Sequence, residues 1–130
     1  MAFQFKKHYS LEEARALLPQ LRLWLQELNQ HRQRVTRLDQ RLAQLLAAGA
    51  DAGGDVVNDF IRGLAGIKKG LRQFQEREIQ IKDLERGLID FPAILAGREV
   101  FLCWEQDEQD IEFWHDLETG YGGRERLPEA

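Results

Sequence analysis

The stretch SLEEARALLPQLRLWLQELNQ, residues 10–30, decides the first element of the fold. Ser10 and Glu13 match a capping box, in which each side chain accepts a hydrogen bond from a free backbone amide at the start of a helix. Apolar residues then recur at steps of three and four, the spacing of one face of an amphipathic helix. This apolar stripe consists of Leu11, Ala14, Leu18, Leu21, Leu25 and Leu28.

The stripe resumes after a polar gap, so we expect one long amphipathic helix over about residues 10–48. Pro19 lacks an amide proton and is expected to kink this helix or to break its first two turns. The segment AAGADAGGD, residues 47–55, consists of small residues, glycine and aspartate, which predicts a turn. The second part of the stripe consists of Val35, Leu38, Leu42, Leu45 and Leu46.

A second helix is expected over about residues 55–86, with Asp55 as its N-cap and Gly87 as its C-cap. Three glycines inside it lower its stability by roughly 1 kcal/mol each, and they are better explained if another backbone lies close on that side. Two long helices joined by a short turn predict an antiparallel hairpin of coiled-coil type. The glycines are Gly63, Gly66 and Gly70, and the apolar stripe consists of Val57, Phe60, Ile61, Leu64, Ile67, Leu71, Phe74, Ile81 and Leu84.

Beyond Gly87 the apolar period falls from that of a helix to the two-residue alternation of a strand. We expect an antiparallel meander, with a turn at Ala96–Gly97 and a second turn over residues 105–109. The segment FQFKKH alternates as well and is a candidate edge strand. The expected strands lie near residues 88–92, 99–104 and 111–115, with the candidate edge strand over residues 3–8.

These elements predict an α+β fold, mainly α, in a single domain over residues 1–130. It has a long antiparallel helical hairpin (about 10–86) with a small three- or four-stranded antiparallel sheet and a tail (about 87–130) at one end. Around residues 30–70 only two helices are available to build a core, and an exposed apolar flank predicts a partner. The leading hypothesis is therefore a small interaction or scaffold protein that forms a homodimer through its hairpin, with another protein as the alternative partner.

Composition restricts the class of protein. The formal net charge is −4, and the single cysteine, Cys103, cannot form an internal disulfide, which indicates a reducing compartment. No apolar run approaches the ~18 residues of a membrane span and the first residues contain no signal-peptide core, so we expect a cytoplasmic protein without a membrane-spanning part.

Residues 99–130 carry ten acidic residues against two arginines, so this end is complementary in charge to the basic helices.

Four blocks of the sequence stand out: YSLEEARALLPQLR (9–22), IKDLERGLIDFPA (81–93), GREVFLCW (97–104) and IEFWHDLETGYGGR (111–124). Together they resemble the prokaryotic domain-of-unknown-function family 2203. The resemblance implies one domain with a long helical hairpin and a small sheet, and it implies no biochemical activity. Members of the family tend to have a glycine-containing turn after the CW strand, whereas this chain has EQDEQD, which favours a longer acidic loop.

A candidate ligand-binding site lies at the edge of the expected sheet, where a tryptophan, a histidine, an aspartate and an arginine could meet. The segment GYGGR would let the backbone fold tightly and carry Arg124 back over the sheet. An arginine in such a place could bind the carboxylate or the phosphate of a ligand. It could equally form an ion pair with Asp90 or Asp116 and so hold the C-terminal tail against the sheet. The candidate residues are Asp90, Trp104, His115 and Arg124.

A metal-binding protein or an enzyme is the alternative hypothesis. His115, Asp116 and Glu118 offer ligands for a divalent metal, but neighbours on a strand face opposite sides, so His115 and Asp116 could share an ion only at a strand end. Cys103 could act as a nucleophile with His115 as its base, although a buried strand cysteine is commoner. The sequence contains no HxH, HExxH or CxxC spacing, so no cofactor is predicted and catalytic residues are not assigned.

Nucleic-acid binding through the basic hairpin is the third hypothesis. The basic residues are interspersed with acidic residues and glutamines, and no aromatic residues interleave on the polar face, so nucleic-acid binding is kept as a second alternative to the leading hypothesis. These residues are Arg22, Arg32, Arg34, Arg37, Arg41, Arg62, Lys68, Lys69 and Arg72.

Overall fold

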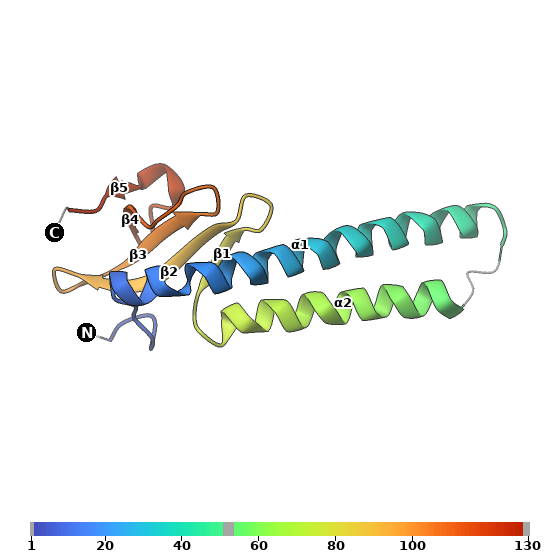
Figure 1. Ribbon diagram of the computed structural model, residues 1–130, viewed down its shortest axis with the longest axis horizontal. Coiled ribbons are helices and arrows are strands. Elements are labelled where there is room, and N and C mark those ends of the chain that lie inside the picture. Colours follow the sequence, from blue (N-terminus) through green and yellow to red (C-terminus); the bar gives the residue numbers. More distant parts are fainter. Residues whose placement is uncertain (1, 51–53, 129–130) are drawn as a thin grey trace. The chain divides into compact units, whose positions relative to one another are not determined.

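A computed structural model of the protein describes residues 2–50 and 54–128, in which helices and an antiparallel sheet form an α+β fold (Figure 1). The chain divides into two compact units. The sheet unit comprises the residues up to Leu23 and those from Phe74 onward, and the hairpin unit comprises Trp24–Gln73. The elements are α1 (Leu11–Ala47), α2 (Gly54–Gln75), β1 (Gln80–Asp83), β2 (Leu88–Leu95), β3 (Arg98–Glu105), β4 (Phe113–Asp116), the short 3-10 helix η1 (Tyr121–Gly123) and β5 (Glu125–Arg126).

Helix α1 begins at the predicted capping box. The Glu13 amide donates to Ser10 Oγ at 3.1 Å, and the Ser10 amide donates to Glu13 Oε1 at 3.0 Å. The helix continues through Pro19, so the predicted break in its first two turns is wrong. Pro19 is exposed, and water can therefore hydrate the carbonyl group that the missing amide leaves without an intrahelical partner.

Within the hairpin unit, α1 and α2 lie side by side, and the three glycines of α2 allow this close approach (Figure 1). A Cβ atom added at Gly66 would lie 2.7 Å from the ring of His31. One added at Gly70 would lie 2.5 Å from Leu28 Cδ2. The hairpin is therefore held by side chains of α1 packed onto the backbone of α2. Residues 51–53 of the predicted turn lie outside the described residues.

The predicted end of the second helix near residue 86 is wrong, because α2 ends at Gln75. The Ile79 amide donates to the Phe74 carbonyl at 3.0 Å and the Glu78 amide to the Gln75 carbonyl at 3.1 Å, as in a Schellman motif. Glu78 takes the left-handed conformation (φ 57°) that glycine usually adopts there, so the sequence carried no visible stop signal. Gly87 lies in the β1–β2 turn and is not a helix cap.

The sheet has five antiparallel strands in the order β1-β2-β3-β4-β5, which corrects the expected number of three or four. β2 and β3 match two expected strands, and β4 begins two residues later than expected. β1 was missed because Ile81 also fits a helical stripe, and β5 because a strand of two residues has no detectable period.

Residues 3–8 form no strand, so the candidate edge strand is wrong. Their backbone amides bond to two carboxylates instead. The amides of Gln4 and Phe5 donate to Glu99, and those of Lys6 and Lys7 donate to Glu78. Side-chain carboxylates can satisfy backbone amides as well as a neighbouring strand does. The alternation of residues 3–8 is compatible with both arrangements, so it could not distinguish them.

The strand register assigns each side chain to one of two buried faces. Ile89 pairs with Trp104, and Asp90 pairs with Cys103. The face of Trp104 contacts α1, whose Arg22 guanidinium lies 4.9 Å from the Trp104 ring. The opposite face carries Asp90 and Cys103, so a polar cluster lies on the side of the sheet that α1 does not cover.

We predict that Gly66→Leu destabilises the protein by about 1–3 kcal/mol, because the new side chain overlaps His31. Leucine has a higher helix propensity than glycine, so any loss of stability must come from the overlap with His31. Urea unfolding measures the change. Gly54→Leu is the matched control, since an added Cβ at Gly54 meets no atom within 4 Å. Equal stability of Gly66→Leu and the unmodified protein would contradict the close approach.

Candidate functional site

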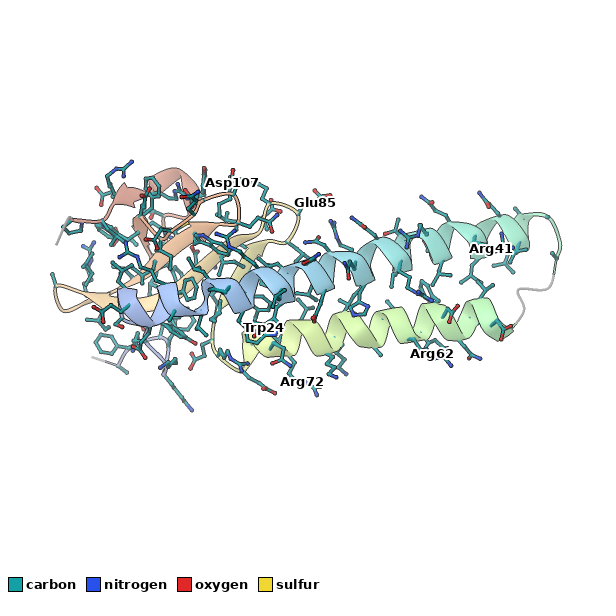
Figure 2. The ribbon with its side chains drawn as sticks, in the orientation of Figure 1. Trp24, Arg41, Arg62, Arg72, Glu85 and Asp107 are labelled. Carbon is teal, nitrogen blue, oxygen red and sulfur yellow. The ribbon has the colours of Figure 1, made fainter. Side chains whose placement is uncertain are left out.

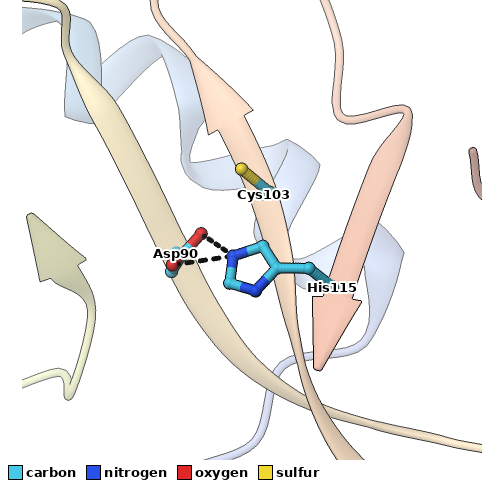
Figure 3. Close-up of side chains that lie close together, drawn as sticks. All are labelled: Asp90, Cys103 and His115. Carbon is cyan, nitrogen blue, oxygen red and sulfur yellow. Dashed lines mark hydrogen bonds and ion pairs between the residues drawn. The ribbon is translucent and has the colours of Figure 1, made fainter. Parts of the chain in front are cut away.

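Three neighbouring strands place Asp90, Cys103 and His115 together on one face of the sheet (Figure 3). Asp90 is 1% exposed, Cys103 0% and His115 2%, so the cluster lies in the interior of the sheet unit. One potential ligand atom from each residue lies within 4.8 Å of the other two. The cluster is therefore compact enough to act as a unit.

Asp90 and His115 form a buried ion pair. His115 Nε2 lies 3.0 Å from both carboxylate oxygens of Asp90, and His115 Nδ1 lies 2.7 Å from the carbonyl oxygen of Asp116. A carbonyl oxygen only accepts, so Nδ1 donates, and Nε2 donates to the carboxylate. Burial lowers the pKa of His115, but the hydrogen bonds to Asp90 and Asp116 raise it and prevail. The imidazolium and the carboxylate neutralise each other.

Cys103 completes the cluster as a thiol. Burial, together with the negative charge of Asp90, raises the pKa of Cys103 to about 12, although Arg124 acts in the opposite direction. Arg124 Nη1 lies 3.9 Å from Cys103 Sγ. Because a thiolate is the nucleophilic form, this cysteine lacks the activation that covalent catalysis requires.

Arg124 lies over the cluster, as the flexible GYGGR segment predicted, but its ionic partner is Glu108. Two guanidinium nitrogens bond to the Glu108 carboxylate at 2.8 and 3.2 Å, and the guanidinium carbon lies 3.8 Å from the centroid of the Phe113 ring. The expected pairing of Arg124 with Asp90 or Asp116 is wrong, because Asp90 bonds to His115 and Asp116 pairs with Arg98. Arg124 nevertheless fixes the tail.

Glu108 organises the acidic loop between β3 and β4. Its carboxylate also accepts the Glu105 amide at 2.7 Å. Its carbonyl accepts Trp104 Nε1 and Arg22 Nη2, each at 2.9 Å. The charge complementarity seen in the sequence is thus realised inside the sheet unit, where Arg15 of α1 also pairs with Asp110. The loop is longer and more acidic than a tight turn, as the EQDEQD segment predicted.

The four candidate residues do not all converge. Asp90 and His115 bond to each other and Arg124 reaches the cluster through Cys103, whereas Trp104 lies on the opposite face. The metal candidates Asp116 and Glu118 lie outside the one group of described residues whose ligand atoms are close enough to hold an ion. His115 and Asp116 face opposite sides, as strand alternation predicted.

The sequence analysis considered Cys103 only as a nucleophile beside His115. Its place in a cluster with Asp90 was missed, although a signal for it was present. The two-residue turn at Ala96–Gly97 joins Leu95 to Arg98, and counting back from it pairs Asp90 with Cys103. Both turn residues have positive φ, 52° and 77°, as a type I′ turn requires. The turn thus determines which side chains of β2 and β3 share a face.

The fold and the cluster define an α+β protein that has a helical hairpin, a five-stranded antiparallel sheet and a buried Asp-Cys-His group. The family model described as an uncharacterized conserved protein (DUF2203) matches residues 7–127, so the chain belongs to the DUF2203 family. No curated protein and no solved structure matches the chain. Neither helix, over its described residues, has the apolar length needed to cross a membrane.

We predict that Cys103 in the folded protein reacts very slowly with a thiol reagent at a pH of about 8, because the thiol is buried and protonated. Reaction with Ellman's reagent, followed by absorbance, measures the rate. The same protein in concentrated guanidinium chloride is the control and should react within minutes. Rapid reaction of the folded protein would show that Cys103 is accessible and activated.

We also predict that Asp90→Ala destabilises the protein by about 3–5 kcal/mol, because it leaves the buried His115 without its counterion. Arg98→Ala is the control, since it removes an ion pair whose side chains are 61% and 46% exposed and should cost less than about 1 kcal/mol. Chemical unfolding compares the two. A loss for Asp90→Ala as small as that of the control would contradict the ion pair.

Proposed function

We propose that the protein is a small interaction protein that forms a homodimer through its hairpin unit. The observation that carries the proposal is an apolar face on α2. Val57 is 37% exposed, Ile61 56% and Leu64 46%. Spacings of four and three residues put these side chains on one face of the helix, where exposed apolar surface marks an interaction site.

The hairpin unit also lacks a closed core of its own. Among its described residues beyond Leu28, Gly63 is the only buried one, while Val35, Leu38 and Leu42 are half-buried. Two helices share a single interface, and each leaves the remaining sides of its apolar surface in contact with water. A second pair of helices would bury this surface in a four-helix bundle.

A second copy of the chain can pair with this face if the two α2 helices run antiparallel. Lys68 follows Leu64 on the exposed face, one helical turn further along. In a parallel pairing of two α2 helices, Lys68 would face Lys68 of the other copy. An antiparallel pairing about a two-fold axis near Ile61 and Leu64 separates these charges and joins like apolar surfaces, as an isologous interface requires.

We predict that Ile61→Asp converts a dimer into a monomer, because it places a charge at the centre of the proposed interface. Light scattering coupled to size-exclusion chromatography measures the mass. Leu23→Asp is the matched control: Leu23 is 54% exposed, much as Ile61 is, but lies on α1 and should leave the dimer intact. A monomeric unmodified protein at micromolar concentration, or equal effects of both variants, would contradict the proposal.

The nucleic-acid hypothesis has weaker support. Arg62 and Arg72 project outward from α2 (Figure 2), but several cations of the hairpin and of α1 already have acidic or carbonyl partners. Asp59 pairs with Arg34 at 3.5 Å and with Arg62 at 3.3 Å, and Arg22 bonds to the loop after β3.

We place the protein in the cytoplasm, a reducing compartment that suits its single thiol.

A further inference from the structure

We propose that Asp90, Cys103 and His115 form a binding site for a transition-metal ion, with zinc as the metal that the donor set favours. The site would be separate from the proposed dimer interface and does not depend on it. Sulfur, imidazole nitrogen and carboxylate oxygen are the three donor types found at zinc sites. Magnesium and calcium, which prefer oxygen ligands alone, fit this set poorly.

The strand register provides the geometry. Asp90 and Cys103 are directly paired on β2 and β3, and His115 enters the same face from β4, so each ligand comes from a different strand of one sheet. Their ligand atoms lie within 4.8 Å of one another. Tetrahedral zinc with bonds of about 2.0–2.3 Å holds its ligand atoms about 3.3–3.8 Å apart. Asp90 and His115, now 3.0 Å apart, would separate by only a few tenths of an ångström.

The orientation of His115 is a second, independent observation in favour of a metal. Its Nδ1 donates to the Asp116 carbonyl at 2.7 Å and therefore keeps its proton. Nε2 is then the nitrogen that can coordinate an ion, and it points at the Asp90 carboxylate (Figure 3). A ligating histidine usually has its other ring nitrogen fixed by such a bond, which sets the tautomer and the direction of the lone pair.

The charges of the ligands suit a divalent ion. In the bound form Zn²⁺ would be held by the carboxylate of Asp90, the thiolate of Cys103 and the neutral imidazole of His115, and the protons that these ligands lose would pass to solvent. Two negative charges then balance the two positive charges of the ion, so no unbalanced charge is buried.

The positive charge of Arg124 favours the metal-bound form of the group. Arg124, whose Nη1 lies 3.9 Å from Sγ, would donate to the thiolate of the metal-bound form. Among the described residues no fourth ligand belongs to the group, so water or another small molecule would complete the coordination.

The test is a metal titration of the full chain after treatment with a chelator. We expect one Zn²⁺ per chain by isothermal titration calorimetry. The enthalpies in buffers of different ionisation heat should show that binding releases protons, because a thiolate replaces the thiol of Cys103. Co²⁺ should produce a near-ultraviolet band from thiolate-to-metal charge transfer. Absence of stoichiometric binding, or binding without this band, would overturn the proposal.

Matched variants assign the site. Cys103→Ala should abolish the cobalt band and weaken zinc binding by more than the about 10–100-fold that loss of a supporting contact costs. Glu118→Gln, an exposed carboxylate outside the group, should bind as the unmodified chain does. Unchanged zinc affinity in Cys103→Ala would refute the assignment. If Cys103→Ala fails to fold, the cobalt band of the unmodified chain decides the question.

Discussion

The two-residue turn at Ala96–Gly97 is the constraint on which the sheet unit depends. The positive φ values of both turn residues give the backbone the twist of a tight hairpin. A turn of only two residues then fixes which residues of β2 and β3 are paired. A slip by one residue would exchange the two faces and place Asp90 and Cys103 against α1. The division of the sheet into an apolar face with Trp104 and a polar face with His115 follows from that alignment.

The polar face is acceptable in an interior because each charge has a partner. Asp90 neutralises His115, and Glu108 holds Arg124 above the thiol of Cys103. Glu108 also accepts Trp104 Nε1 through its carbonyl, so the acidic loop connects the two faces of the sheet through a single residue. Such a network contributes little net stability over an apolar core, which is a reason to ask whether the Asp-Cys-His group serves binding instead.

The hairpin unit presents the opposite problem. Its helices approach closely at the glycines of α2, yet they leave Ile61 and Leu64 in water. Glycines permit a close contact on one side of the helix and contribute no apolar surface of their own. The proposed dimer would supply the missing surface. The sheet unit and the hairpin unit would then have separate tasks, one binding an ion and the other binding a second chain.

The sequence by itself determined the elements whose signals are local. The capping box at Ser10 and Glu13, the long stripe of α1, the close approach at the glycines and the alternation of β3 are all set by neighbours within a few residues. The four sequence blocks also identified the family correctly, since its model matches residues 7–127.

Tertiary structure decided what depends on distant partners. Helix α2 ends at Gln75 and is followed by a left-handed glutamate, Glu78. The carboxylate of Glu78 and the buried side chains of Phe74 and Ile79 stabilise this conformation, which a local pattern assigns to glycine. Residues 3–8 bond to carboxylates and so need no neighbouring strand. The cluster is the clearest case: Asp90 and His115 lie 25 residues apart, and only the register of three strands brings their charges to hydrogen-bonding distance.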